Sequence, residues 1–139
     1  MKRVFLDTNI LLDYGLDREQ ADYAENILEL GREGYIELYA SFLSFANMGY
    51  ILRHHPVEEI YSLIRMMRKP VNVLSCDAEQ LDAGLDFQVK DFEDMMQYQC
   101  ALASGCDVII TNNKKDFYSF CNLPFLSSEE FLLQFDFQQ

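Results

Sequence analysis

The sequence contains few basic residues. Its 139 residues include 11 Lys and Arg against 23 Asp and Glu, which gives a formal net charge of −12 at pH 7. A protein that binds nucleic acid without sequence preference normally carries a broad basic surface. The scarcity of positive charge argues against that mode of binding. Any contact with phosphate groups must therefore be local, or bridged by metal ions.

Long apolar runs and paired cysteines are also missing. No stretch approaches the roughly 20 apolar residues needed to cross a bilayer, and nothing at the N-terminus resembles a signal peptide. No C-x-x-C pair occurs, and the four cysteines are expected to be free, buried thiols of a reducing compartment: Cys76, Cys100, Cys106 and Cys121. We therefore expect a soluble cytoplasmic protein that does not associate with membranes.

The composition is typical of a globular protein. Half of the residues are hydrophobic and 14% are aromatic, whereas only six Gly and three Pro occur. A chain of this length has the size of one typical domain, which buries roughly two thirds of its unfolded surface. We expect residues 1–139 to form a single domain. The eleven Phe residues are more than one small core readily hides, which favours a homodimer or a bound partner helix.

Short apolar runs alternate with longer amphipathic segments along the chain. Strands are predicted at 3–6, 35–40, 71–75 and 107–111, with a further short strand before the last helix. Helices are predicted at 18–33, 45–55, 56–69, 77–86 and 91–104, and again from Ser127, which has a capping-box spacing with Glu130. Either Ser41 or Ser44 can cap the helix that runs through 45–55. This alternation predicts an α/β fold, in which helices cover both faces of a parallel sheet.

Three polar residues follow the first predicted strand, in the stretch "VFLDTNILLDY" at residues 4–14. Asp7, Thr8 and Asn9 interrupt an otherwise apolar run. The carboxyl ends of parallel strands form the ligand crevice of such sheets, so these side chains are placed to face a ligand. The alternative is that Asp7 or Thr8 merely caps a helix that begins near Ile10.

Two further polar groups are expected at the same edge of the sheet. The segment after the strand at 107–111 supplies Thr111, Asn112, Asn113 and Asp116. The helix at 91–104 begins with several acidic residues, of which Asp94 projects from the first turn, while Asp91 is better interpreted as the N-cap.

Carboxylates that converge in one crevice repel one another. Their pKa values rise, or a cation neutralises them. Ligand sets made only of oxygen atoms select hard cations, so Mg²⁺ or Mn²⁺ is the expected occupant. An ion held in this way can lower the pKa of a bound water and stabilise charge on a phosphorus centre. It would also allow an acidic protein to hold a phosphodiester.

Four segments together resemble the PIN domain family, of the PilT N-terminus type: "VFLDTNILLDY", "SFLSFANMGYILR", "DFEDMMQYQCALASGCDVIITNNKKDF" and "LPFLSSEEFL". The resemblance spans essentially the whole chain. It implies a three-layer α/β/α domain with a parallel sheet of about five strands, and a metal-dependent nuclease that usually cuts single-stranded RNA. Many bacterial members are the toxin of a VapBC pair, so the resemblance also implies a small antitoxin protein as partner.

The family's functional residues carry over to matching positions of this chain. Asp7 matches the first carboxylate of the family, Asp94 matches the one that opens the penultimate long helix, and Thr111, Asn113 and Asp116 match the last cluster. Thr8 and Asn9 match the polar pair beside the first aspartate. The chain departs from the family at two positions: Asn47 stands where most members have a glutamate, and Asn113 where many have an aspartate.

These observations lead to one expected function and one alternative. We expect a Mg²⁺- or Mn²⁺-dependent ribonuclease in which Asp7, Asp94 and Asp116 bind the ion. The side chains expected to orient ligands, water or phosphate are Thr8, Asn9, Asn47, Thr111, Asn112 and Asn113. The alternative is a catalytically weak or inactive PIN-fold scaffold, because Asn47 and Asn113 each remove a negative charge.

Overall fold

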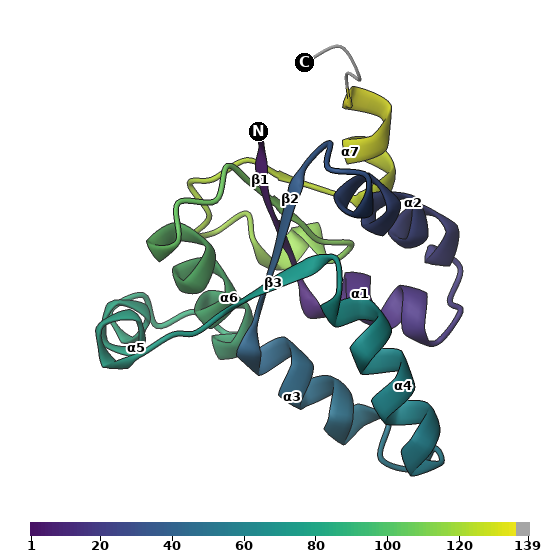
Figure 1. Ribbon diagram of the computed structural model, residues 1–139. Coiled ribbons are helices and arrows are strands. Elements are labelled where there is room, and N and C mark those ends of the chain that lie inside the picture. Colours follow the sequence, from purple (N-terminus) through teal and green to yellow (C-terminus); the bar gives the residue numbers. More distant parts are fainter. Residues whose placement is uncertain (136–139) are drawn as a thin grey trace.

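The computed structural model describes residues 1–135, and its centre is a parallel sheet (Figure 1). The five strands are β1 (Arg3–Leu6), β2 (Glu37–Ser41), β3 (Val71–Leu74), β4 (Val108–Ile110) and β5 (Phe125–Leu126). Their order across the sheet is β3-β2-β1-β4-β5, and every neighbouring pair is parallel. The predicted α/β fold with a parallel sheet of about five strands is confirmed.

Within residues 1–135, seven α-helices connect and follow the strands. They are α1 (Thr8–Gly15), α2 (Ala21–Arg32), α3 (Phe42–Ile51), α4 (Val57–Arg68), α5 (Ala78–Leu85), α6 (Phe92–Ala103) and α7 (Ser128–Gln134). A single 3₁₀ turn, η1 (Lys114–Asp116), follows β4. None of the helices in residues 1–135 is both long and apolar enough to cross a membrane.

All the predicted strands and helices are present, and the differences lie at their ends. Helix α1 begins at Thr8, earlier than the position near Ile10 that the sequence indicates, because the side chain of Asp7 caps it directly. Helix α3 begins at Phe42, because Ser41 is the N-cap and its Oγ accepts a hydrogen bond from the N–H of Ser44. The capping box of Ser127 and Glu130 is confirmed at the start of α7.

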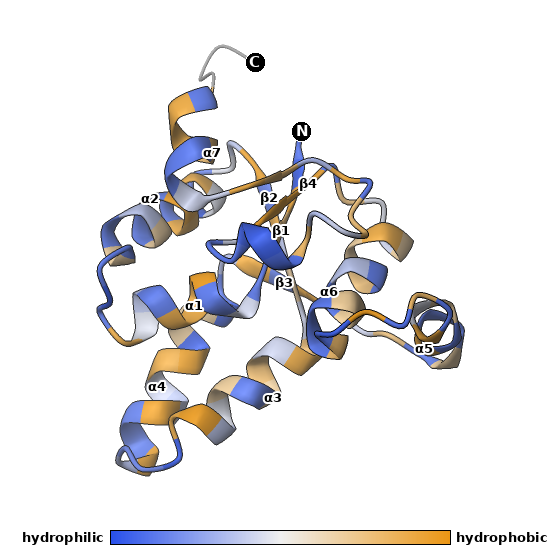
Figure 2. Ribbon diagram, turned by 180° about the vertical axis from the view of Figure 1, so that it is seen from behind, coloured by the Kyte–Doolittle hydropathy of each residue, from blue (hydrophilic) through white to orange (hydrophobic). Residues whose placement is uncertain are grey.

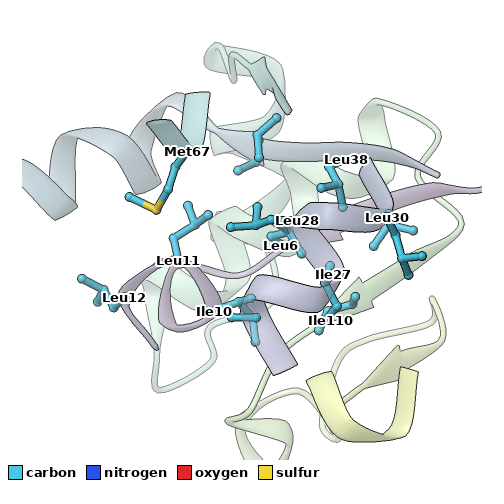
Figure 3. Packing of buried hydrophobic residues seen from close by; sticks show 14 of the residues in the cluster. Leu6, Ile10, Leu11, Leu12, Ile27, Leu28, Leu30, Leu38, Met67 and Ile110 are labelled. Atoms are coloured by element: carbon cyan, nitrogen blue, oxygen red, sulfur yellow. The ribbon is translucent and has the colours of Figure 1, made fainter. Parts of the chain in front are cut away.

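The sheet divides the core into two layers, because successive residues of a strand point to opposite faces. Val4 and Leu6 of β1 pack with buried residues of α1, α2 and α4 on one face (Figure 3). On the other face, Phe5 packs against α6 and the segment that contains Phe117 and Phe120. Helix α5 packs against α6 and lies outside it (Figure 1). This is the expected three-layer α/β/α arrangement.

The four cysteines are free thiols, as expected, but they are not all buried. Cys100 and Cys106 are buried, and burial raises the pKa of the Cys106 thiol to about 11. Cys121 is half-buried, and Cys76 is exposed. The prediction for Cys76 was wrong because its apolar run, strand β3, ends at Leu74 and leaves Cys76 in the connection to α5.

The close approach of α2 to β2 generates a first prediction. A Cβ atom added at Gly31 would overlap the side chain of Leu38, which is fully buried. Gly31→Ala should therefore destabilise the protein by about 1 to 3 kcal/mol, the usual cost of overpacking a core. Gly49→Ala is the matched control, because a Cβ at Gly49 in α3 meets nothing within 4 Å. Urea denaturation of both variants measures the difference, and equal stability of the two would contradict the described packing.

Candidate functional site

The order of the strands places a crevice at the carboxyl ends of β1 and β4. The chain passes from β1 to β2 and β3 on one side, and β4 then returns to the other side of β1. Ligands bind at such a reversal of strand order in open α/β sheets. Leu6 of β1 is paired with Ile110 of β4, so Asp7 and Thr111 leave the sheet as neighbours. The polar residues after these two strands meet, as predicted.

Asp7 is both a helix cap and a member of this polar group. Its side chain is buried, with 4% of the residue exposed, and its Oδ1 accepts a hydrogen bond of 2.8 Å from the N–H of Thr8. Its Oδ2 accepts hydrogen bonds from Thr111 Oγ1 at 2.8 Å and from Asn9 Nδ2 at 3.0 Å. The two interpretations of Asp7 that the sequence leaves open are therefore compatible with each other.

Helix α6 contributes two more carboxylates. Asp91 is its N-cap, as predicted, and Asp91 Oδ1 accepts a hydrogen bond from the N–H of Asp94 at 3.1 Å. Asp94 lies in the first turn and is only 8% exposed. Its Oδ2 atom is buried and has no hydrogen-bond partner among the described residues. A buried acceptor without a partner costs about 1 to 3 kcal/mol, and more when it is charged.

Three carboxylates converge at this point. One oxygen from each of Asp91, Asp94 and Asp116 lies within 4.8 Å of the others. The structure thus brings together two of the three predicted metal ligands, Asp94 and Asp116, and adds Asp91. A carboxylate has two oxygens, so capping through one of them leaves Asp91 able to bind a cation as well. Asp7 lies close enough to contribute the largest of the charge effects on Asp94.

The electrostatic state of the two buried aspartates reflects this crowding. The pKa of Asp94 is raised to about 8, mainly by burial and in addition by the neighbouring charges of Asp7, Asp91 and Asp116. Burial also raises the pKa of Asp7 to about 6, although the hydrogen bonds from Thr111 and Thr8 lower it. Buried carboxylates that lie this close together are stable when they bind protons or when they bind a cation.

Asp116 is held from two directions. Asn113 donates a hydrogen bond from Nδ2 to Asp116 Oδ2, and the N–H of Asn113 donates to Thr111 Oγ1 at 3.0 Å. Lys114, in the same 3₁₀ turn as Asp116, forms an ion pair of 2.8 Å with Glu130 of α7. The turn that carries Asp116 is therefore attached to both β4 and α7.

Asn47 also contacts a carboxylate. It lies on α3, and its Nδ2 donates a hydrogen bond of 3.0 Å to Oε1 of Glu93. Glu93 is exposed in the first turn of α6, and its negative charge raises the pKa of both Asp7 and Asp94. Sequence interpretation did not assign Glu93 to the site. Its position between Asp91 and Asp94 was the available signal.

A buried hydrogen-bond network below the carboxylates includes a residue that sequence interpretation missed. Gln97 is fully buried on α6, and its Nε2 donates to Thr8 Oγ1 at 3.2 Å and to Ser44 Oγ at 2.9 Å. Its Oε1 accepts from Ser41 Oγ at 2.9 Å. The network joins α1, α3 and α6. The spacing of Asp94 and Gln97 was a usable signal, because residues i and i+3 share one face of a helix.

Asn112, predicted as a residue that orients ligands, forms hydrogen bonds with other parts of the chain. Its Nδ2 donates to Asp13 at 2.8 Å, and its Oδ1 accepts from the N–H of Ser128 at 3.0 Å. Its own N–H donates to Asn9 at 3.2 Å. These contacts connect the end of β4 to α1 and α7.

The donor set fits a hard divalent cation. All the candidate ligand atoms are carboxylate oxygens, which suit Mg²⁺ and Mn²⁺. The buried Oδ2 of Asp94 lacks the partner that a cation would supply, and the surrounding like charges would be neutralised by the same ion.

Comparison with known proteins agrees with the fold. The ribonuclease VapC1 of Aquifex aeolicus (strain VF5) is 24% identical over 136 residues, which cover 94% of this chain and 93% of that protein. Among solved structures, VapBC2 from Rickettsia felis bound to a promoter DNA fragment gives a TM-score of 0.72 at 19% identity, covering 88% of this chain and 96% of the other. VapBC-1 from nontypeable Haemophilus influenzae gives 0.71 at 21% identity, covering 91% and 98%.

The family itself is established by a match to part of the chain that contains most of the site. The model of the PIN domain matches residues 3–115, which run from the start of β1 to the 3₁₀ turn after β4. This range includes Asp7, Asp91 and Asp94, and it ends one residue before Asp116. The chain therefore belongs to the PIN domain family.

Proposed function

We propose that this protein is an endoribonuclease that requires Mg²⁺ or Mn²⁺ and hydrolyses phosphodiester bonds of single-stranded RNA. The observation that carries the proposal is the group of three carboxylates, Asp91, Asp94 and Asp116, together with the buried Oδ2 of Asp94, which has no partner among the described residues. The similarity to a protein named as a ribonuclease supports the reaction type. The single-stranded substrate is supported by the resemblance to the PIN family.

The proposed roles follow from the contacts. Asp94 and Asp116 would hold the ion, together with Asp91 and the adjacent Asp7. When bound, the ion would supply a water of lowered pKa and stabilise negative charge on the phosphate. It would also bridge the phosphodiester to a protein whose net charge is −12. Thr111 and Asn9 keep the carboxylate of Asp7 in place through their hydrogen bonds.

The alternative function is a scaffold with the same fold and no effective metal binding. The amides of Asn47 and Asn113 favour it, because they bring no negative charge to positions where PIN domains usually have acids. The two functions differ in their response to metal. A ligand at about 100 times its dissociation constant adds roughly 2.7 kcal/mol to the free energy of unfolding. A scaffold would melt at the same temperature with and without millimolar Mg²⁺ or Mn²⁺.

The nuclease proposal is tested most directly at Asp7. Asp7→Asn should abolish cleavage of a fluorescent single-stranded RNA in the presence of Mn²⁺ while the protein stays folded, because the substitution keeps the shape of the side chain and removes its charge. Circular dichroism of the variant checks the fold. Cleavage at the wild-type rate by this variant would show that the activity lies elsewhere or comes from a contaminant.

The pH dependence of metal binding is a second test of the same proposal. Because the pKa values of Asp7 and Asp94 are raised on folding, to about 6 and about 8, the folded state binds protons more tightly than the unfolded state. Without metal, this tighter proton binding stabilises the folded state against unfolding. The contribution is complete below the ordinary aspartate pKa of about 4 and is lost as the pH rises towards 8. Stabilisation by Mn²⁺ should show the opposite trend, since protons compete with the ion.

Melting curves with Mn²⁺ or EDTA at about pH 6 and about pH 8.5 measure both trends. The expected shift with Mn²⁺ is larger at the higher pH. Asp94→Asn should raise the melting temperature in EDTA at about pH 8.5, because it removes a buried charge among like charges, and it should greatly reduce the shift with Mn²⁺. A shift in Asp94→Asn equal to that of the wild type would remove Asp94 from the ligand set.

We also propose a small antitoxin protein as partner. The similar structures from Rickettsia felis and Haemophilus influenzae are both VapBC assemblies. The α3–α4 surface of this chain carries exposed apolar side chains, and Figure 2 shows hydrophobic residues over much of α3. The most exposed are Tyr50, Phe42, Val57 and Tyr61. A groove of about 430 Å³, lined by residues that include Leu16, Leu63 and Glu58, lies beside them.

The partner is tested by co-expression with the product of the adjacent gene and size-exclusion chromatography. Tyr61→Arg should weaken the complex, because it places a charge on the apolar α3–α4 surface. Leu133→Arg on α7 is the matched control, since Leu133 is also exposed and apolar, with 79% of its surface accessible. Equal retention of the partner by both variants would exclude the α3–α4 surface. The protein alone, run on the same column, tests the expected homodimer.

A further inference from the structure

The two asparagines that depart from the PIN pattern make the same kind of contact. The Nδ2 of each asparagine donates a hydrogen bond to a carboxylate. Asn47 on α3 donates to Glu93 on α6, and Asn113 donates to Asp116 in the 3₁₀ turn.

We propose that Asn47 and Asn113 are positioning residues, which hold the carboxylates of Glu93 and Asp116 towards the cation site. The inference rests on the proposed metal-dependent function. It assigns a task to two side chains that would otherwise be interpreted as lost ligands. It also adds Glu93 to the acidic residues that act on the site.

The position of Asp116 depends more clearly on such a hydrogen bond than the position of Glu93 does. It lies in a single 3₁₀ turn, within the group formed with Asp91 and Asp94, whose negative charges repel it. An amide donor satisfies one oxygen of Asp116 without adding charge to the group. Because Thr111 Oγ1 donates to Asp7 and accepts from the N–H of Asn113, one line of hydrogen bonds connects Asp7 to Asp116.

Glu93 is exposed, so its position depends on few contacts. It directly precedes Asp94 in the first turn of α6, and its negative charge acts on both buried aspartates, Asp7 and Asp94. Repulsion from those aspartates would turn a free glutamate towards solvent. The hydrogen bond from Asn47 opposes this, and it links α3 to the first turn of α6. Exposed contacts are weaker than buried ones, so Asn47 should have the smaller effect.

The test is a pair of double-mutant cycles read out by Mn²⁺ affinity, measured by isothermal titration calorimetry. Asn113→Ala should raise the Kd for Mn²⁺ about 10-fold, the lower end of the usual effect of losing a residue that orients a metal ligand. In the Asp116→Ala background the same substitution should change the Kd by less than about twofold, because its target is gone. Asn47→Ala should follow the same pattern with Glu93→Ala.

Rescue and control variants separate positioning from a general loss of structure. Asn47→Gln keeps an amide donor and should retain more affinity than Asn47→Ala. Asn26→Ala, on the exposed side of α2, should leave the Kd unchanged. Melting curves in EDTA report whether each variant is folded. The pair Asn47 and Glu93 lies at the surface, so its cycle is measurable even if Asp116→Ala does not fold.

The outcomes distinguish this inference from the proposed function. Additive effects in both cycles would overturn the inference, because they would mean that the asparagines act independently of the carboxylates. An unchanged Kd in both asparagine variants would overturn it as well. In either case Mn²⁺ binding by the wild-type protein would leave the nuclease proposal intact. Absence of Mn²⁺ binding by the wild type would overturn both.

Discussion

Repulsion between buried negative charges is the constraint around which the site is organised. Asp7 and Asp94 are almost inaccessible to water, and the negative charges of Asp91 and Glu93 act on both of them. Burial alone penalises an ionised carboxylate, and like charges add to the penalty. A fold that gained nothing from this group would replace it with apolar or neutral residues. Without a cation this group therefore lowers the stability of the fold at neutral pH, a cost that the cation of the proposed function would offset.

The rest of the structure keeps these acids together. The parallel sheet brings the ends of β1 and β4 to one edge, and α6 begins beside them. Hydrogen bonds then hold the individual side chains. Thr111 donates to Asp7, Asn113 donates to Asp116, and Gln97 of α6 donates to Thr8 of α1. All three donors are neutral. They limit the freedom of the carboxylates to move apart without cancelling the charge that attracts a cation.

The parts of this arrangement that depend on local pattern could be predicted from the sequence. Apolar runs that end in polar residues located Asp7 and Thr111, and the rule for parallel sheets placed them together. The convergence of Asp94 with Asp116 was also expected. Asp91 was assigned only to a cap, because a sequence pattern does not show that one carboxylate can use its two oxygens for different tasks.

Gln97, Glu93 and the role of Asn112 were harder to predict, because their contacts join segments far apart in the chain. Gln97 reaches residues 8, 41 and 44, and Asn112 reaches Asp13 and Ser128. Only the packing of helices decides which polar side chain meets which. Cys76 shows the same limit, since its exposure depends on where β3 ends and the next connection begins.

The attachment of η1 to α7 has a consequence for biosynthesis. Glu130 binds Lys114 in the turn that carries Asp116, and Ser128 binds Asn112 just before that turn. Helix α7 is translated after all the acids of the site. A nascent polypeptide on the ribosome therefore has its carboxylates before it has the helix that fixes the last of them, and the centre is fully assembled only after this helix has emerged from the exit tunnel.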